Sequence, residues 1–462
     1  MNAWSGDHLG MYHSLSTIDR SGGEADGTRS YAVTGYLLPN AQRPNLRVLT
    51  EALVERLVVS PDGTVSGVEF EHGGNCHKVS VKKEVVLSAG VVSLSQLPFP
   101  ILCSYGNVVM LLLWRLQGLI ILATLFSHQQ TTNTKTKFKT PQILELSGIG
   151  NPSILTAAGI KPIINNPRIG ENFHDHPATG FGYELADGEH SLDSMQDPSY
   201  VETVMAEYAS TRSGPLSTGG AAMGFVSYAD LATPAEVLAL QDLMLSPTHG
   251  GHTPEAKQLL AQGIASKDEA SIQIVLLPAS LNVKHAYDQT KFFEQPPEMA
   301  GKHGFLLGAC IARPLSVGTV HIASSDPKVD PEIDPAYLSH PADVEIFSKG
   351  LAIVEKMVNT SPFKEKVKRR YYPDGPLDLS DKKAVETYVR GNVATEYHPL
   401  GSCAMGKEGV GAVDDRLKVY GCKGVRVVDA SVIPLHVSGN IVATVYAVAE
   451  KGADLIKEDW KL

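Results

Sequence analysis

Runs of apolar residues that end in small or turn-forming residues recur along the chain and predict strands. EVVLSAG (84–90) and GVRVVDASVIP (424–434) are continuous apolar runs, which is typical of strands covered on both faces of a sheet. SIQIVLLPA (271–279) and GTVHIAS (318–324) favour strands through their β-branched residues. These runs predict a mixed fold in which buried strands alternate with helices.

Helical periodicity appears in two places between and after these runs. Asp197 followed by Pro198 predicts the start of a helix, because aspartate caps and proline suits the first turn. Its expected buried face consists of Val201, Val204, Met205 and Tyr208. ATVYAVAEKGADLIKEDW (443–460) predicts an amphipathic helix at the end of the chain. The pattern therefore indicates an α/β domain with a second, mixed or antiparallel-sheet α+β domain between about 180 and 330.

One stretch breaks this pattern. Residues 108–126 form an almost unbroken apolar run, and the polar stretch TTNTKTKFKT follows shortly after it. The length of the run is that of a membrane span, but Arg115 and Gln117 lie at its centre, where a charge costs about 2.5–3.5 kcal/mol on insertion scales. We therefore do not expect a membrane partner.

Composition and charge exclude several classes of protein. Hydrophobic residues make up 43% and charged residues 19% of the chain, which indicates a globular protein. The net charge is −10 without a lysine or arginine block, so a nucleic-acid partner is not expected. The five cysteines have irregular spacing, which predicts neither a disulfide framework nor a metal site. The first residues, MNAWSGDHLG, do not predict a signal peptide, and the compartment stays open.

The candidate catalytic residues cluster near the end of the chain. EYHPLGSCAMG (396–406) contains His398, and a histidine is the natural base for taking a proton from a hydroxyl group near neutral pH. Asn440, in LHVSGN, precedes the final predicted helix, where it could donate to a developing alkoxide beside a positive helix terminus. Oxidation of an alcohol also transfers a hydride, which only a cofactor can accept.

Each of these residues also has a purely structural interpretation. Taken alone, His398 is a loop histidine before a proline, and Asn440 is a helix cap. His436 fits packing or the surface as well as catalysis. His174, Asp175 and His176 resemble a metal-binding pair, but without a third ligand at recognisable spacing we interpret them as structural. Cys403 is expected to pack as a small apolar residue.

Several segments in the same order resemble the glucose–methanol–choline (GMC) oxidoreductase family, and they cover most of the chain. The most specific are YHPLGSCAMG (397–406) and VVDASVIPLHVSGN (427–440). Further segments that match are GTRSYAVTGYLLPNAQRPNLRVLTEALV (27–54), TPQILELSGIG (140–150), RIGENFHDHP (168–177) and RPLSVGTVHIASSDPKVDPEIDPAYLSHPADVE (313–345). The tail is similar to fungal members that oxidise aryl or secondary-metabolite alcohols.

The resemblance implies an FAD-dependent enzyme that oxidises the CH–OH group of an alcohol to an aldehyde or ketone. It implies that His398 is the catalytic base, that Asn440 holds the substrate oxygen and that hydride passes to flavin N5. It assigns the following residues to the cofactor site: Val54, Asp429, Ala430, Asn440 and Ile441.

The same comparison predicts the domain organisation. Joining Ser93 to Thr140 gives SAGVVSTPQILELSGIG, which follows the family pattern without a gap, so 94–139 is interpreted as an insertion foreign to the fold, similar to a translated intron. The FAD-binding domain then comprises 1–93, 140–180 and 396–462, and the substrate-binding domain comprises 181–395.

The sequence also departs from the family, because it contains no GxGxxG turn of the kind that holds the FAD pyrophosphate. We therefore expect this chain to bind FAD weakly or not at all and its sheet to have an exposed edge. The alternatives to an active oxidoreductase are a catalytically inactive remnant, a redox-neutral cyclase on the same fold and, more distantly, a membrane-anchored interaction protein. The substrate, the electron acceptor and the oligomeric state stay open.

Overall fold

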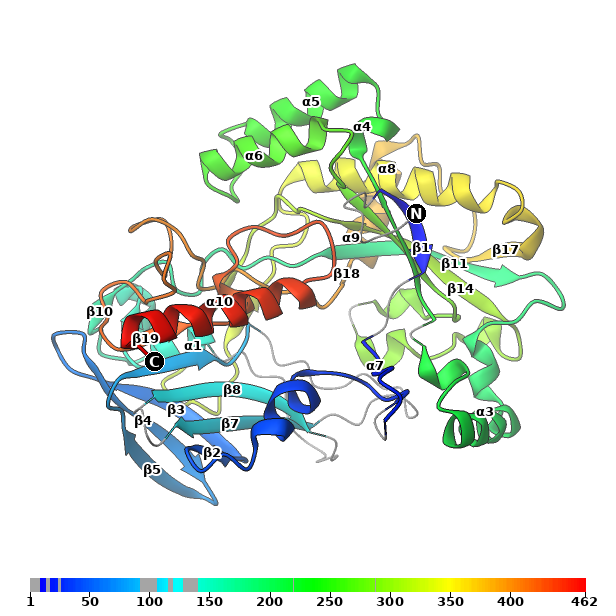
Figure 1. Ribbon diagram of the computed structural model, residues 1–462. Coiled ribbons are helices and arrows are strands. Elements are labelled where there is room, and N and C mark those ends of the chain that lie inside the picture. Colours follow the sequence, from blue (N-terminus) through cyan, green and yellow to red (C-terminus); the bar gives the residue numbers. More distant parts are fainter. Residues whose placement is uncertain are drawn as a thin grey trace.

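The computed structural model describes residues 9–13, 17–23, 26–91, 106–114, 119–127, 140–218, 220–286 and 288–462. Within them the chain forms two lobes (Figure 1). One lobe contains the strands β2 to β8 with helices α1 and α10, and the other contains a large antiparallel sheet covered by helices. The α/β and α+β character predicted from the sequence is confirmed.

A five-stranded sheet forms the centre of the first lobe, in the order β19-β6-β8-β7-β2. Its first three strands are parallel to one another, whereas β7 runs antiparallel to both of its neighbours. A second, antiparallel sheet in the order β3-β4-β5 lies beside it. The strands are β2 (Leu46–Leu49), β3 (Ala52–Val59), β4 (Val65–His72), β5 (Asn75–Ser80), β6 (Glu84–Ser88), β7 (Gly106–Trp114), β8 (Leu119–Ser127) and β19 (Val425–Val427). The helices of this lobe are α1 (Thr140–Leu146), α2 (Pro152–Ala157) and α10 (Val442–Trp460).

The apolar run 108–126 belongs to this sheet as two strands, β7 and β8. They pair with each other in register from Gly106↔Ser127 to Trp114↔Leu119, and β8 also pairs with β6 along its whole length. The sheet ends in two outer strands, β19 and β2, and the exposed edge expected from the sequence stays a prediction. The foreign origin of 94–139 stays a prediction. Among the described residues, no helix is long and apolar enough to cross a membrane.

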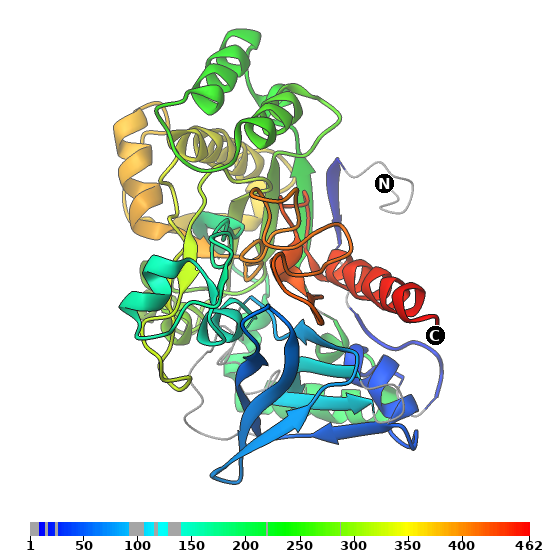
Figure 2. The same ribbon diagram turned by 90° about the vertical axis from the view of Figure 1, so that its left-hand side faces the viewer.

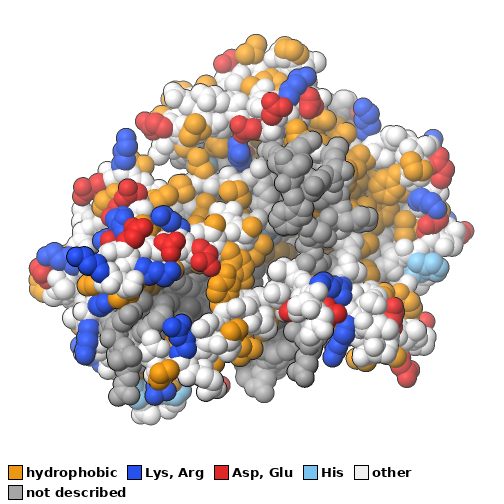
Figure 3. Space-filling view, viewed as in Figure 1, with side chains coloured by type: hydrophobic (Ala, Val, Ile, Leu, Met, Phe, Trp, Pro, Cys, Tyr) orange, Lys and Arg blue, Asp and Glu red, His pale blue; other side chains and the backbone are white. Residues whose placement is uncertain are grey.

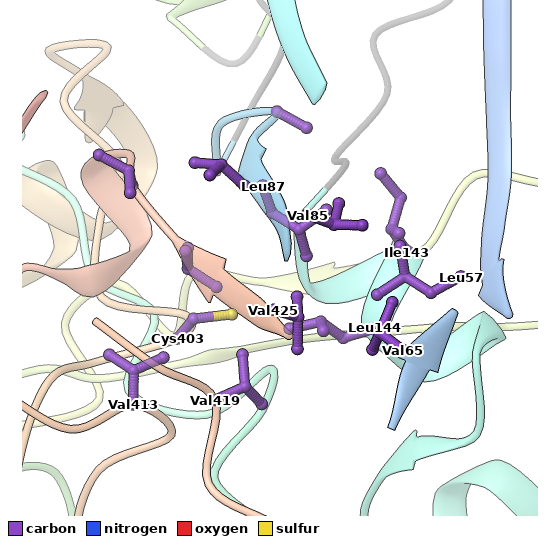
Figure 4. Close-up of a cluster of buried hydrophobic side chains, with 14 of the residues drawn as sticks. Leu57, Val65, Val85, Leu87, Ile143, Leu144, Cys403, Val413, Val419 and Val425 are labelled. Carbon is purple, nitrogen blue, oxygen red and sulfur yellow. The ribbon is translucent and has the colours of Figure 1, made fainter. Parts of the chain in front are cut away.

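The core of this lobe lies where β6, β19 and α1 meet (Figure 4). Val85 and Leu87 of β6, Val425 of β19, and Ile143 and Leu144 of α1 belong to one cluster; all are 2% exposed or less. Cys403 lies in the same cluster, fully buried, so its expected role as a small apolar residue is confirmed. The four cysteines among the described residues are free.

The second lobe contains a seven-stranded sheet whose neighbouring strands are all antiparallel. Its strands are β1 (Gly10–His13), β11 (Pro177–Leu185), β12 (Ala222–Val226), β13 (Ile272–Leu277), β14 (Gly304–Ile311), β17 (Val367–Tyr372) and β18 (Ala394–Thr395). Its helices are α3 (Pro198–Thr211), α4 (Tyr228–Leu231), α5 (Pro234–Leu245), α6 (Pro254–Ala265), α7 (Gln289–Phe292), α8 (Pro341–Val358) and α9 (Lys382–Asn392). Two details differ from the sequence-based boundaries, because β1 joins this sheet from the start of the chain and β11 begins before residue 181.

Helix α3 shows what the sequence pattern predicted correctly and what it did not. Asp197 caps it, with its carboxylate accepting a hydrogen bond from the Ser199 backbone N–H at 2.9 Å, and Pro198 is its first residue. Of the predicted buried face, however, only Val204 is buried, and Met205 is 55% exposed. The helix lies at the rim of the lobe, so one turn of contact is enough to hold it (Figure 1).

A buried ion pair joins α1 to β15 (Thr319–His321), which pairs with β16 (Glu332–Asp334). His321 Nδ1 lies 2.7 Å from Glu145 Oε1, and its Nε2 lies 3.4 Å from Glu171 Oε1. Burial opposes protonation of His321, but hydrogen bonds to both carboxylates and their charges outweigh it and raise its pKa to about 9. His321 is therefore a cation at neutral pH.

This pair predicts a pH-dependent contribution to stability. A histidine whose pKa is higher in the folded state stabilises fully below its unfolded pKa, near 6.5, and loses that contribution as the pH rises through about 9. We expect the free energy of unfolding to fall by about 2–3 kcal/mol more across this window in the wild type than in His321→Gln. Urea unfolding at several pH values measures the difference, with His77→Gln on the exposed strand β5 as the matched control. A parallel pH dependence of wild type and His321→Gln would contradict the assignment.

Candidate active site

The segment that carries His398 crosses between the two lobes (Figure 2). Directly before it, β18 pairs with β11 of the second lobe, and directly after it Leu400 bridges His174. Farther along, β19 pairs with β6 of the first lobe, and Asn440 lies two residues before α10. The two segments that contain the candidate catalytic residues His398 and Asn440 therefore meet at the junction of the lobes.

His398 and Asn440, predicted to act together, are in contact. Asn440 Nδ2 lies 3.2 Å from His398 Nε2. Asn440 does not cap α10, whose amino terminus has no side-chain cap, so its amide is directed to the histidine instead. Burial lowers the pKa of His398 to about 4, and the imidazole is neutral at physiological pH. A neutral imidazole is the form that can accept a proton.

The nitrogen of His398 that carries the proton is fixed by His176. His176 Nε2 lies 2.8 Å from the Ala312 carbonyl oxygen and 3.1 Å from that of Val437, and both of these can only accept. Burial, then the nearby His398, lowers the pKa of His176 to about 3, so its ring is neutral and its Nδ1 must be an acceptor.

This arrangement determines the tautomer of His398. His176 Nδ1 lies 3.0 Å from His398 Nδ1, so His398 must donate from Nδ1. Its Nε2 therefore carries the lone pair, which accepts a hydrogen bond from the Asn440 amide. His398 Nε2 and the Asn440 amide face the same point, at which an acceptor and a donor are available together.

The backbone of His398 is held by Asp175. Asp175 Oδ1 accepts a hydrogen bond from the His398 backbone N–H at 2.9 Å. Asp175 Oδ2 accepts hydrogen bonds from the hydroxyl groups of Tyr337 and Thr395. Tyr397, the residue before His398, has φ of +62°, a left-handed conformation that a tyrosine rarely adopts. The buried carboxylate of Asp175 thus stabilises a strained turn that aims the imidazole.

The triplet His174–Asp175–His176 is consequently more than the structural element that the sequence analysis proposed. His176 and Asp175 both contact His398, and His436 stacks on His176 with ring centroids 3.8 Å apart. His174 packs edge-on against His436, with centroids 4.9 Å apart. Within the described part of the chain, no group of three or more histidine, cysteine or carboxylate residues could hold a metal ion.

Gln273 is a site residue that the sequence analysis missed. It lies on β13 and is fully buried, and its Nε2 lies 3.4 Å from both Asn440 Oδ1 and Met223 Sδ. These are long contacts, but they set the amide of Asn440 so that its NH₂ group points to His398. The sequence offered one indication of this role, because Gln273 is a polar, buried residue within an otherwise apolar strand.

The residues assigned to the cofactor lie around the ends of β6 and β19 and the start of α10. The four acceptor sites of the Asp429 carboxylate are already used by the Gly90 N–H, the Thr140 hydroxyl, and the N–H and hydroxyl of Ser431. Asp429 and its neighbour Ala430 can therefore offer a cofactor only backbone groups and close contact.

Two further features of the structure fit a dinucleotide cofactor. Val54 lies on β3, an edge strand whose outer backbone groups are not used by its own sheet. Ile441 is the first flanking residue of α10, whose uncapped N–H groups favour an electronegative ligand atom. Hydrophobic side chains gather at the surface near that end of α10 (Figure 3), and Val442 is 55% exposed there. The residues present fit the flavin end of FAD.

Comparison with known proteins identifies the family. Models of GMC oxidoreductase match residues 9–97 and 314–449. Dehydrogenase mpl7 of Monascus purpureus and dehydrogenase citC of Monascus ruber are each 35% identical over 470 residues, covering 99% of this chain and 67% of the relative. The chain thus spans about two thirds of the length of these relatives.

Solved structures show the same fold. The formate oxidase of Aspergillus oryzae, described in a study of FAD modification, has a TM-score of 0.73 at 24% identity and is covered to 67% by this whole chain. An FAD-dependent oxidoreductase from Chaetomium thermophilum has a TM-score of 0.74 at 22% identity, with 99% of this chain and 68% of that one aligned. A fungal aryl-alcohol oxidase gives 0.69 at 24% identity, with 94% and 65% aligned. The chain belongs to the GMC oxidoreductase family, an enzyme family whose cofactor is FAD.

Proposed function

We propose that this chain oxidises a primary or secondary alcohol to the corresponding aldehyde or ketone, with His398 as the base and Asn440 as the ligand of the substrate oxygen. The observation that supports this most strongly is the fixed tautomer of His398, whose Nε2 lone pair lies 3.2 Å from the Asn440 amide nitrogen. An alcohol needs a proton acceptor and an oxygen ligand at one point, and these two groups meet that need.

The roles of the residues follow from their contacts. A hydroxyl group that takes the place of the direct contact between the two side chains would donate its proton to His398 Nε2 and accept a hydrogen bond from Asn440 Nδ2. Bound FAD would supply the acceptor for the hydride from the carbinol carbon. The imidazolium formed on His398 would keep its Nδ1–H bond to His176, so the ring need not turn during proton transfer.

Asp175 and His176 are positioning residues in this scheme. Asp175 holds the His398 backbone, and His176 holds the ring in one tautomer. Neither touches the reacting atoms. Anaerobic reduction of bound flavin by a primary alcohol tests the proposal, because a catalytically inactive relative or a redox-neutral cyclase would leave the flavin oxidised.

The tautomer assignment makes a separate prediction. His176→Phe removes the acceptor for His398 Nδ1–H, so the proton can move to Nε2 and block the base; we expect the rate of flavin reduction to fall about 10²-fold. His176→Asn places an amide oxygen near the former Nδ1 position and should recover most of this loss.

Two measurements separate tautomer control from general packing. In ¹⁵N-histidine spectra, His398 should show a protonated Nδ1 in the wild type and in His176→Asn, and lose that preference in His176→Phe. The pH profile of flavin reduction should change in His176→Phe and stay close to the wild type in His176→Asn. An unchanged tautomer and pH profile in His176→Phe would refute the role given to His176.

A further inference from the structure

A cavity that is partly open to solvent lies in the second lobe, and the residues directly before His398 line it. Its volume is about 220 Å³. The walls are mostly apolar side chains from β12, β13 and the α7 region, and one end is formed by the segment that precedes His398. The lining residues that matter are Met223, Val275, Phe292, Phe293, Glu396 and Tyr397.

The cavity adjoins the catalytic pair on two sides. Glu396 and Tyr397 precede His398 directly in the chain. On the other side, the Gln273 side-chain amide contacts Met223 Sδ, which lines the cavity, and also Asn440 Oδ1. His398 and Asn440 do not line the cavity themselves, but they lie directly behind lining residues, His398 through the chain and Asn440 through Gln273.

The size of the cavity matches a single substituted aromatic ring. An apolar cavity of about 150 Å³ is enough to bind benzene, so about 220 Å³ accommodates a ring with small substituents. The rings of Phe292 and Phe293 pack edge-on, with centroids 5.0 Å apart, and form one wall. Such a wall favours an aromatic or flat apolar ligand.

Glu396 is unusual in this apolar surrounding. Its backbone N–H donates to the His176 carbonyl oxygen at 3.0 Å. Its side chain is half-buried, and among the described residues none donates a hydrogen bond to the carboxyl group. Burial, and then the charge of Asp175, raise the pKa of Glu396 to about 7. A carboxyl group in an apolar cavity without a partner is costly, so a ligand that donates a hydrogen bond to it is favoured.

We propose that the cavity binds the ring of an aromatic alcohol and that a second hydroxyl group on this ring donates a hydrogen bond to Glu396. This inference rests on the proposed function, because it places the reacting CH–OH group at His398. It assigns Glu396 a role in substrate specificity, since a hydroxybenzyl alcohol gains a partner there that an unsubstituted or methyl-substituted ring cannot provide.

Calorimetric binding of small alcohols to the full chain with FAD present tests the proposal without requiring turnover. The three hydroxybenzyl alcohol isomers are compared with the three methylbenzyl alcohols, which have nearly the same size and shape. We expect at least one hydroxyl isomer to bind about 10-fold or more tightly than its methyl counterpart. Equal affinity within all three pairs would overturn the inference, as would the absence of binding by every alcohol.

Variants at Glu396 test whether this residue causes the tighter binding of the hydroxyl isomer. Glu396→Leu should abolish the preference for the hydroxyl isomer, whereas Glu396→Gln, which keeps an acceptor oxygen, should keep part of it. Glu255→Gln, on the exposed surface of α6, should keep all of it. A preference that survives in Glu396→Leu, with thermal unfolding like the wild type, would overturn the inference.

The same ligands separate the two proposals. Preferential binding of a hydroxyl isomer without flavin reduction would support the Glu396 site and refute the proposed function. Flavin reduction at equal efficiency by the hydroxyl and methyl isomers would support the proposed function and refute the role of Glu396.

Discussion

Replacing His398 with alanine is expected to lower the rate of flavin reduction by an alcohol about 10²–10⁴-fold, the usual contribution of a positioned general base. The reason is geometric, because Asn440 and His398 Nε2 are 3.2 Å apart and no other described imidazole nitrogen contacts Asn440. His176, the nearest neighbour, has its Nε2 committed to two carbonyl groups and cannot replace the base.

Rapid mixing of the FAD-loaded protein with alcohol under anaerobic conditions measures this rate. The absorbance of the oxidised flavin should match the wild type before mixing, because His398 lies in the base position and not among the residues assigned to the cofactor. His190→Ala, a histidine variant on the surface of the second lobe, should reduce its flavin like the wild type. If His398→Ala also reduced its flavin at the wild-type rate, His398 would not be the base.

Replacing Arg426 with leucine is expected to destabilise the first lobe by about 3–5 kcal/mol, because it leaves a buried carboxylate without its partner. Arg426 on β19 is 0% exposed, and its Nε donates to Glu84 Oε2 of β6 at 2.8 Å. Its Nη2 donates to Asp459 Oδ2 near the end of α10 at 3.0 Å. The Trp460 indole N–H donates to the other oxygen of Glu84 at 2.9 Å. This network fixes α10, whose amino terminus follows Asn440.

Urea unfolding measures the loss, and a double variant gives the sharper test. Arg426→Leu combined with Glu84→Leu removes both buried charges, so it should be more stable than Arg426→Leu alone. Lys423→Ala provides the control, because its ion pair with Asp62 joins side chains that are 71% and 62% exposed and contributes little. If Arg426→Leu were as stable as Lys423→Ala, the buried network would not be what holds α10.

The sequence predicted the two candidate catalytic residues, but not the contacts that position them. His398 and Asn440 lie in recognisable local patterns, and the structure brings them into contact. His176 was visible as part of an HDH triplet, but its role depends on a contact with a residue 222 positions away. Gln273 reaches Asn440 from another lobe, 167 positions away. Local patterns carry no information about such long-range pairs.

The apolar run 108–126 shows the same limit in the fold. Its composition is compatible with a helix, a buried strand or a membrane span, and periodicity alone does not separate these. In the structure it is divided into two strands because β6 offers a free edge with which β8 can pair. Strands and caps with clear local signals, such as 84–90 and Asp197, were predicted correctly. Weak binding of FAD by this chain stays a prediction.

The most direct test of the proposed alcohol oxidation is the absorption spectrum of the purified chain with excess FAD, recorded anaerobically before and after addition of a primary aromatic alcohol. The proposal predicts that the oxidised-flavin band disappears, and that it disappears more slowly when the carbinol carbon carries deuterium. A flavin that binds but stays oxidised with every primary and secondary alcohol tried would contradict it.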